Sequence, residues 1–160
     1  MRGRWFEEIV PGETLDHGCF RFSAEEIIAF ARQYDPQPFH LDEEAGRNSY
    51  LGGLCASGWQ TLAAYMKCCA ANDQAGRAEL AAQGKALPPV GPSPGFEDLK
   101  WMRPVYAGDT ISYRSTAKSK RALSSRPGWG LVYYRNEGFN QKGEPVISFT
   151  GKLLVARRTS

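Results

Sequence analysis

The sequence predicts an α+β protein in which an antiparallel sheet wraps around one long apolar helix. Residues 58–71 carry apolar side chains on nearly every side and contain no proline, and a helix of this kind belongs in a core. The last third of the chain alternates apolar and polar residues between short turns, which is typical of an antiparallel meander. Wrapping the sheet around the helix is the simplest way to bury both. A length of 160 residues with 42% apolar content suits a single compact domain over residues 1–160.

The first clear element is a helix that begins after residue 23. Ser23 and Glu26 form a capping box. An apolar face follows at the spacing i, i+3, i+4 and i+7, made by Ile27, Phe30, Ala31 and Tyr34. Pro36 ends the helix, because a proline ring pushes the preceding residue out of the helical region. Asp35 therefore lies on a helix-terminating turn.

Strands are expected where apolar or aromatic residues recur at even spacing between turn residues. The expected strands are residues 96–103, 110–117, 129–139 and 147–155, with edge pieces at 4–9 and 18–22. Residues 72–95 are polar and then rich in proline and glycine. We expect them to form a long connection, with a short helix around residues 77–83.

Composition and charge exclude several classes of protein. The net charge of +3 comes from interspersed residues, with one compact basic cluster at Lys118, Lys120 and Arg121. This is too little for a nucleic-acid partner, and a solvated strand edge is favoured over a contact with the phosphates of a ligand. The first residues lack the charged-then-apolar order of a secretory signal, and no apolar run approaches the roughly 20 residues that cross a bilayer. We therefore expect a soluble, cytoplasmic protein without a membrane partner.

Several residues are expected to have structural roles. His17 is placed in a surface turn, and Asp109 is interpreted as a turn former between strands. Core positions on the apolar helix are assigned to Trp59, Tyr65 and Met66. The cysteines fit neither a zinc site nor a redox pair, so we expect reduced and mostly buried thiols at Cys19, Cys55, Cys68 and Cys69.

One pair of residues indicates chemistry. The chain has only two histidines, and His40 follows Asp35 by five residues in a segment that Pro36 and Pro38 stiffen. A rigid segment can hold a carboxylate and an imidazole toward one point, as joint activation of a water molecule requires. The alternative is that Asp35 only caps a helix end and that His40 lies on the surface. Spacing alone does not decide between the two.

The same segment resembles the hydratase signature of the MaoC-like family, G-D-x-N-P-x-H, whose Asp and His are the catalytic residues. Asp35, Pro38 and His40 match it directly. Tyr34 stands where the signature has glycine, and Gln37 stands where it has asparagine. Gln37 keeps the amide group on a longer arm and would orient the loop or a ligand, while Tyr34 would narrow the pocket.

Two further stretches are similar to the family. Residues 50–59 look like its glycine-rich approach to a central helix, and residues 93–95 and 99–109 look like its passage into the main strands. The resemblance implies a hotdog fold, in which the loop at residues 34–40 overhangs the site. It also implies a homodimer or a dimer of dimers, because in this family the long helices of two subunits lie against each other.

The chemistry that the resemblance implies is a hydro-lyase reaction on an α,β-unsaturated acyl thioester. Asp35 and His40 would polarise a water molecule that attacks the β-carbon, and one of the pair would return a proton to the α-carbon. The backbone N–H of Gly58, at the positive end of the helix, would stabilise the negative charge on the thioester oxygen. Ser57 either hydrogen-bonds His40 or the substrate, or serves as the N-cap of the helix.

The implied substrate is a coenzyme A thioester first and an acyl-carrier thioester second, with no metal and no bound cofactor. Two rival functions remain. A thioesterase on the same fold would direct water at the carbonyl, and the pairing of Asp35 with His40 argues against it. A non-catalytic subunit that binds acyl thioesters is left open by the departures at Tyr34 and Gln37.

Overall fold

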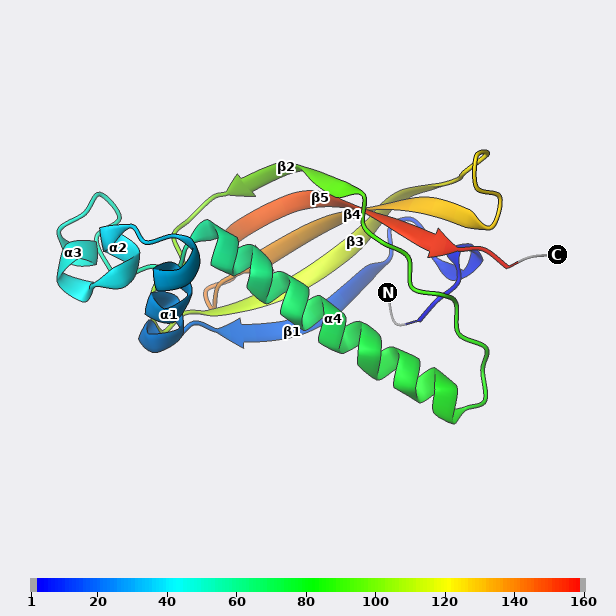
Figure 1. Ribbon diagram of the computed structural model, residues 1–160, viewed down its shortest axis with the longest axis horizontal. Helices are drawn as coiled ribbons and strands as arrows, with labels where there is room; N and C mark the ends of the chain where they lie inside the picture. Colours follow the sequence, from blue (N-terminus) through cyan, green and yellow to red (C-terminus); the bar gives the residue numbers. More distant parts are fainter. Residues whose placement is uncertain (1–2, 159–160) are drawn as a thin grey trace.

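The structure, a computed structural model, describes residues 3–158 (Figure 1). Its centre is a five-stranded antiparallel sheet with the order β1-β3-β4-β5-β2. In chain order the main elements are β1 (Thr14–Arg21), α1 (Ala24–Tyr34), α2 (Pro38–Leu41), α3 (Glu43–Arg47), α4 (Gly58–Ala82), β2 (Gly95–Trp101), β3 (Thr110–Ala122), β4 (Trp129–Phe139) and β5 (Pro145–Ala156). Helix α4 crosses one face of the sheet, and α1, α2 and α3 gather at the end where α4 begins (Figure 1). The predicted α+β class and the wrapping of the sheet around one helix are confirmed.

The predicted meander is formed by β3, β4 and β5, which are consecutive antiparallel neighbours. Their inward-facing side chains join the residues of α4 in the main core, among them Ile111, Tyr113, Ile147 and Phe149. Two of these strands are longer than predicted, because backbone pairing with β4 continues beyond the residues of even spacing. Strand β3 reaches Ala122, and β5 starts at Pro145. One face of the sheet therefore packs against α4 in a single hydrophobic core.

Helix α4 is longer than predicted. It runs unbroken over 25 residues to Ala82, so the connection that we expected from residue 72 begins only after the helix, and no separate short helix precedes it. Asn72 shows why the polar stretch remains helical, because its side-chain amide donates to the backbone oxygen of Asp16 at 2.8 Å. Tertiary contacts with β1 thus stabilise turns that composition alone marks as a loop.

One face of α4 packs on the sheet through buried residues that include Thr61, Ala64, Tyr65, Cys68 and Cys69. The prediction of a core position is confirmed for Tyr65. It is wrong for Trp59 and Met66, whose side chains are each 54% exposed. They lie seven residues apart, about two helical turns, and so share a face of α4 that the sheet covers only in part.

The amino-terminal region differs from the prediction. Residues 6–8 form a short 3-10 helix and not an edge strand, while the second edge piece belongs to β1. His17 is in β1 and is buried, not in a surface turn. Its Nε2 lies 2.7 Å from Ser115 Oγ, and its Nδ1 lies 3.1 Å from Asn72 Nδ2. The pairing of β1 with β3 brings His17 beneath α4, and hydrogen bonds satisfy its buried nitrogens.

Other structural expectations hold. Three of the four cysteines are buried, Cys19 is exposed, and all four are free. Asp109 accepts a hydrogen bond from the backbone N–H of Tyr106 at 2.8 Å, in the turn that precedes β3. The basic cluster lies on the far half of β3 from the end where α4 begins (Figure 1). Within residues 3–158, none of the helices combines the length and the apolar character needed to cross a membrane.

Candidate active site

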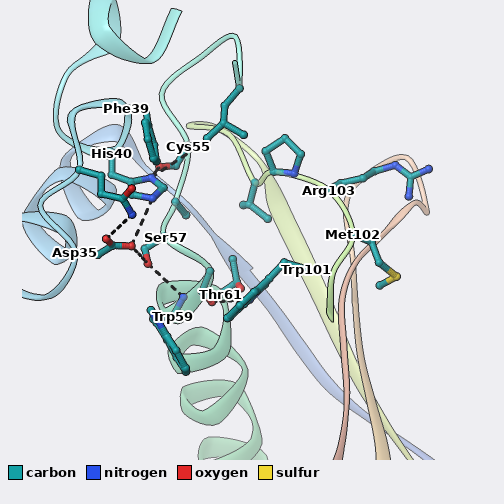
Figure 2. A pocket seen from close by; sticks show the side chains of 16 residues that line it. Asp35, Phe39, His40, Cys55, Ser57, Trp59, Thr61, Trp101, Met102 and Arg103 are labelled. Carbon is teal, nitrogen blue, oxygen red and sulfur yellow. Dashed lines mark hydrogen bonds and ion pairs between the residues drawn. The ribbon is translucent and has the colours of Figure 1, made fainter. Parts of the chain in front are cut away.

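A cavity of about 420 Å³ opens where α4 begins, between α2 and the segment that follows β2 (Figure 2). Three segments of chain, within residues 35–40, 51–61 and 101–105, supply its walls. The lining residues include Asp35, Gln37, Phe39, His40, Cys55, Ser57, Gly58, Trp59, Thr61, Trp101, Met102 and Arg103. Asp35 and His40 lie on one side, and Trp101, Met102 and Arg103 lie on the other (Figure 2). Asp35 and His40, the pair that the sequence indicates, are therefore brought together in a hollow of a size that suits a small ligand.

Asp35 is the C-cap residue of α1, because Pro36 prevents the helix from continuing. Its Oδ1 accepts a hydrogen bond from Gln37 Nε2 at 2.8 Å, and its Oδ2 accepts one from Ser57 Oγ at 2.6 Å. Burial disfavours the charged form of Asp35, but the hydrogen bonds from Ser57 and Gln37 and the charge of His40 outweigh it. The pKa of the Asp35 carboxyl is therefore lowered. This side chain is an anion at neutral pH.

His40 lies in the single turn of α2, where we expected an irregular loop. It is 6% exposed, so the alternative of a surface histidine is wrong. Its Nδ1 lies 2.7 Å from the backbone oxygen of Cys55, and its Nε2 lies 3.5 Å from Asp35 Oδ2. A carbonyl oxygen only accepts, so Nδ1 donates, and in the neutral ring Nε2 carries a lone pair. Two basic atoms thus face each other beside the cavity.

Ser57 is the N-cap of α4, and its Oγ accepts a hydrogen bond from the backbone N–H of Trp59 at 3.3 Å. The same hydroxyl donates to Asp35 and not to His40. Gly58 follows as the first residue of the helix, where a backbone N–H has no intrahelical acceptor and the helix dipole is positive. The amino end of α4 is therefore a place where negative charge is stabilised.

Trp101 closes the cavity over Gly58. Its Nε1 donates to the backbone oxygen of Gly58 at 3.0 Å, and its ring meets Trp59 edge-on with 5.4 Å between the centroids. A Cβ atom at position 58 would lie 2.5 Å from the indole ring, so glycine is required for this close approach. The two tryptophans form an aromatic wall beside the amino end of α4.

Tyr34 is the one candidate that does not line the cavity. Its side chain is 63% exposed and lies against Phe30, with 4.9 Å between the ring centroids. It borders a second hollow with Gln60, on the other side of the α4 amino end. The expectation that Tyr34 narrows the pocket is wrong, because the turn at Asp35 points neighbouring side chains in different directions.

Several lining residues were not among the candidates from sequence. Trp101, Met102 and Arg103 come from the end of β2, and nothing local in the sequence places this segment opposite His40. Arg103 is the only permanent cation among the residues that line the cavity. It donates to the backbone oxygen of Pro145 at 3.1 Å and lies 3.7 Å from Glu144. In residues 3–158, no group of three or more His, Cys, Asp or Glu side chains is arranged to hold a metal ion.

An antiparallel sheet around one long helix, with an Asp and a His at the helix's amino end, can be compared with known protein families. The model of the MaoC like domain matches residues 8–129, and the chain belongs to this family. The chain superposes on the crystal structure of the MaoC-like dehydratase from Rhodospirillum rubrum with a TM-score of 0.81 and 35% identity, covering 99% of this chain and 100% of that one.

Two further relatives extend the comparison. The chain is 27% identical over 98% of its length to mesaconyl-CoA hydratase of Cereibacter sphaeroides, but it spans only 42% of that protein. A conserved hypothetical protein from Mycobacterium tuberculosis, described as a double hotdog fold, matches with a TM-score of 0.77 and 18% identity. That match covers 99% of this chain and 46% of the other. The predicted hotdog fold is confirmed.

Proposed function

We propose that this protein is a hydro-lyase that adds water to, or removes it from, an α,β-unsaturated acyl thioester. The observation that carries the proposal is the 3.5 Å approach of His40 Nε2 to Asp35 Oδ2, at the wall of a cavity that also contains the amino end of α4. Both atoms are hydrogen-bond acceptors in the neutral-imidazole state. A water molecule has two protons to donate, so one that lies beside the pair, on the cavity side, can donate to both atoms.

The proposed reaction uses the polarity of the thioester. Its β-carbon is electrophilic, and a water molecule held by Asp35 and His40 attacks that carbon while a proton passes to the pair. Electrons move onto the thioester oxygen, where the N–H of Gly58 and the positive end of α4 stabilise them. A proton then returns from the pair to the α-carbon. Protein side chains, the backbone and water supply every group that these reaction steps need.

We propose a coenzyme A thioester as the first substrate to examine and an acyl-carrier thioester as the second. The relative from Cereibacter sphaeroides is named for a coenzyme A substrate, and this supports the order. We also propose that two copies associate, as a homodimer or a dimer of dimers. The half-exposed face of α4, which includes Trp59 and Met66, supports an interface there.

Two other functions compete on the same fold. In a thioesterase the water would attack the carbonyl carbon, and a non-catalytic subunit would bind the thioester without reaction. The pairing of Asp35 with His40 at the cavity wall favours hydration.

An assay of the purified protein with crotonyl-CoA separates the three functions. We expect loss of the absorbance of the conjugated double bond without release of free thiol. Release of thiol would indicate a thioesterase. If neither signal changed while the thioester still bound, the protein would be a non-catalytic subunit and the proposed function would be wrong.

A further inference from the structure

The contacts of the Asp35 carboxylate point to separate roles for the two members of the pair. We infer that Ser57 and Gln37 are positioning residues that hold Asp35 as a fixed, ionised acceptor, so that His40 is the group that carries the proton. This inference rests on the proposed hydration and assigns Ser57 a role other than contact with the substrate.

The hydroxyl of Ser57 is fully used inside the protein. Ser57 has no exposed surface, and its one proton is donated to Asp35 Oδ2 at 2.6 Å. A lone pair of the same oxygen accepts the backbone N–H of Trp59. A serine hydroxyl has a single proton, so none remains for a thioester oxygen. Ser57 thus ties the carboxylate of Asp35 to the first turn of α4.

Gln37 holds the other carboxylate oxygen. Its Nε2 donates to Asp35 Oδ1 at 2.8 Å, and its backbone N–H donates to the backbone oxygen of Asp35, also at 2.8 Å. Both oxygens of Asp35 therefore accept a hydrogen bond from a neutral donor. Such bonds favour the charged form of Asp35, because they weaken when the carboxyl gains a proton. Asp35 is therefore well placed to orient a water molecule and poorly placed to hold the proton that the water molecule gives up.

His40 has the complementary arrangement. Its Nδ1–H is bound by the oxygen of Cys55, while Nε2, which is an acceptor in the uncharged ring, faces Asp35. In the step we propose, the water oxygen bonds to the β-carbon, and one water proton moves to Nε2. The π electrons of the double bond form an enolate, and the same proton then passes from Nε2 to the α-carbon. The atoms of one water molecule are all accounted for, and addition occurs on one face.

The test compares variants by two independent measurements. The titration of the Asp35 carboxyl is followed by NMR in protein with ¹³C-labelled aspartate, assigned with Asp35→Asn, and hydration of crotonyl-CoA is followed by kcat and KM. We expect Ser57→Ala to raise the pKa of Asp35 by about one unit. It should lower kcat about 10- to 100-fold with little change in KM, because the misplaced group does not touch the substrate. Ser57→Thr keeps the hydroxyl and should restore both.

Ser23→Ala is the matched control, because Ser23 caps α1 as Ser57 caps α4 but has no contact with the site. It should change neither the Asp35 titration nor kcat. Gln37→Met removes the second donor at an exposed position and provides the test if Ser57→Ala does not fold. It should also raise the pKa of Asp35.

Each outcome has a definite meaning. An unchanged Asp35 titration in Ser57→Ala or Gln37→Met overturns the inference, whatever the activity. A raised pKa with unchanged kcat overturns it as well. A wild-type protein that does not hydrate crotonyl-CoA counts against the proposed function, while the NMR titration still decides whether Ser57 and Gln37 control Asp35.

Discussion

His40 Nδ1 lies 2.7 Å from the backbone oxygen of Cys55, and this contact determines which imidazole nitrogen faces Asp35. Because the carbonyl oxygen accepts the Nδ1 proton, Nε2 is directed at Asp35 Oδ2, with its lone pair in the uncharged ring. A carboxylate and a lone pair repel unless a neighbouring donor bridges them or the ring gains a proton. The geometry therefore creates a position for a water molecule or a proton before any substrate binds.

The tautomer of His40 is the first prediction. We expect the uncharged ring to take the Nδ1–H form, since Cys55 supplies the acceptor. Long-range ¹⁵N–¹H correlation spectra of the imidazole distinguish the two nitrogens directly. A predominant Nε2–H form would remove the proposed acceptor site and contradict the account.

The low pKa of Asp35 predicts a pH-dependent contribution to stability. A carboxyl whose pKa is lower in the folded than in the unfolded chain stabilises the fold above the unfolded value. That stabilisation is lost as the pH falls through the folded value. Asp35→Asn should therefore reduce the free energy of unfolding by about 1–3 kcal/mol at pH 7.

The loss caused by Asp35→Asn should shrink as the pH approaches 3. Urea unfolding at both pH values measures it. Asp98→Asn, at an exposed position of β2 outside the site, is the control and should have little effect at either pH. A loss of the same size at pH 7 and pH 3 would show that the charge of Asp35 is not responsible.

Gly58→Ala should destabilise the protein although alanine is the better helix former. The added Cβ would meet the indole of Trp101 at 2.5 Å and displace it from the Gly58 oxygen. We expect a net loss of about 1–3 kcal/mol, the usual cost of overpacking. Chemical denaturation measures this loss. In a Trp101→Ala background the same change should be neutral or stabilising, and a loss that persists there would exclude the clash as its cause.

Association of two copies is tested at Met66. Met66→Glu places a charge on the half-exposed face of α4 and should shift the protein toward monomer in analytical ultracentrifugation. Val10→Glu changes an apolar residue of similar exposure that is not part of α4 and should leave the association unchanged. If the wild type sediments as a dimer and Met66→Glu does too, the interface lies elsewhere.

Local signals in the sequence were sufficient for much of the fold. The capping box at Ser23 and Glu26 and the break at Pro36 gave the bounds of α1, because caps and prolines act within a few residues. The meander followed from its turns. The end of α4 was predicted too early, because its polar residues from Asn72 onward are typical of a loop. The contact of Asn72 with β1, which helps to stabilise this part of the helix, joins residues far apart in the sequence.

The part of the candidate site that lies in one short segment of chain was predictable from the sequence. Asp35, Gln37 and His40 are close in sequence, so spacing and a signature were enough to suggest them. Trp101 contacts Gly58 across 43 residues, and that contact depends on how β2 pairs with β5. The burial of His17 has the same origin, because the pairing of β1 with β3 cannot be seen in its neighbours.

The central claim is that Asp35 and His40 together activate water for addition to an enoyl thioester. Its most direct test is the kcat/KM for hydration of crotonyl-CoA by Asp35→Asn, His40→Ala and the double variant. We predict losses of about 10²- to 10⁴-fold for each single variant. The double variant should lose little more, because the two groups act as a unit. Hydration at the wild-type rate by either single variant would contradict the account.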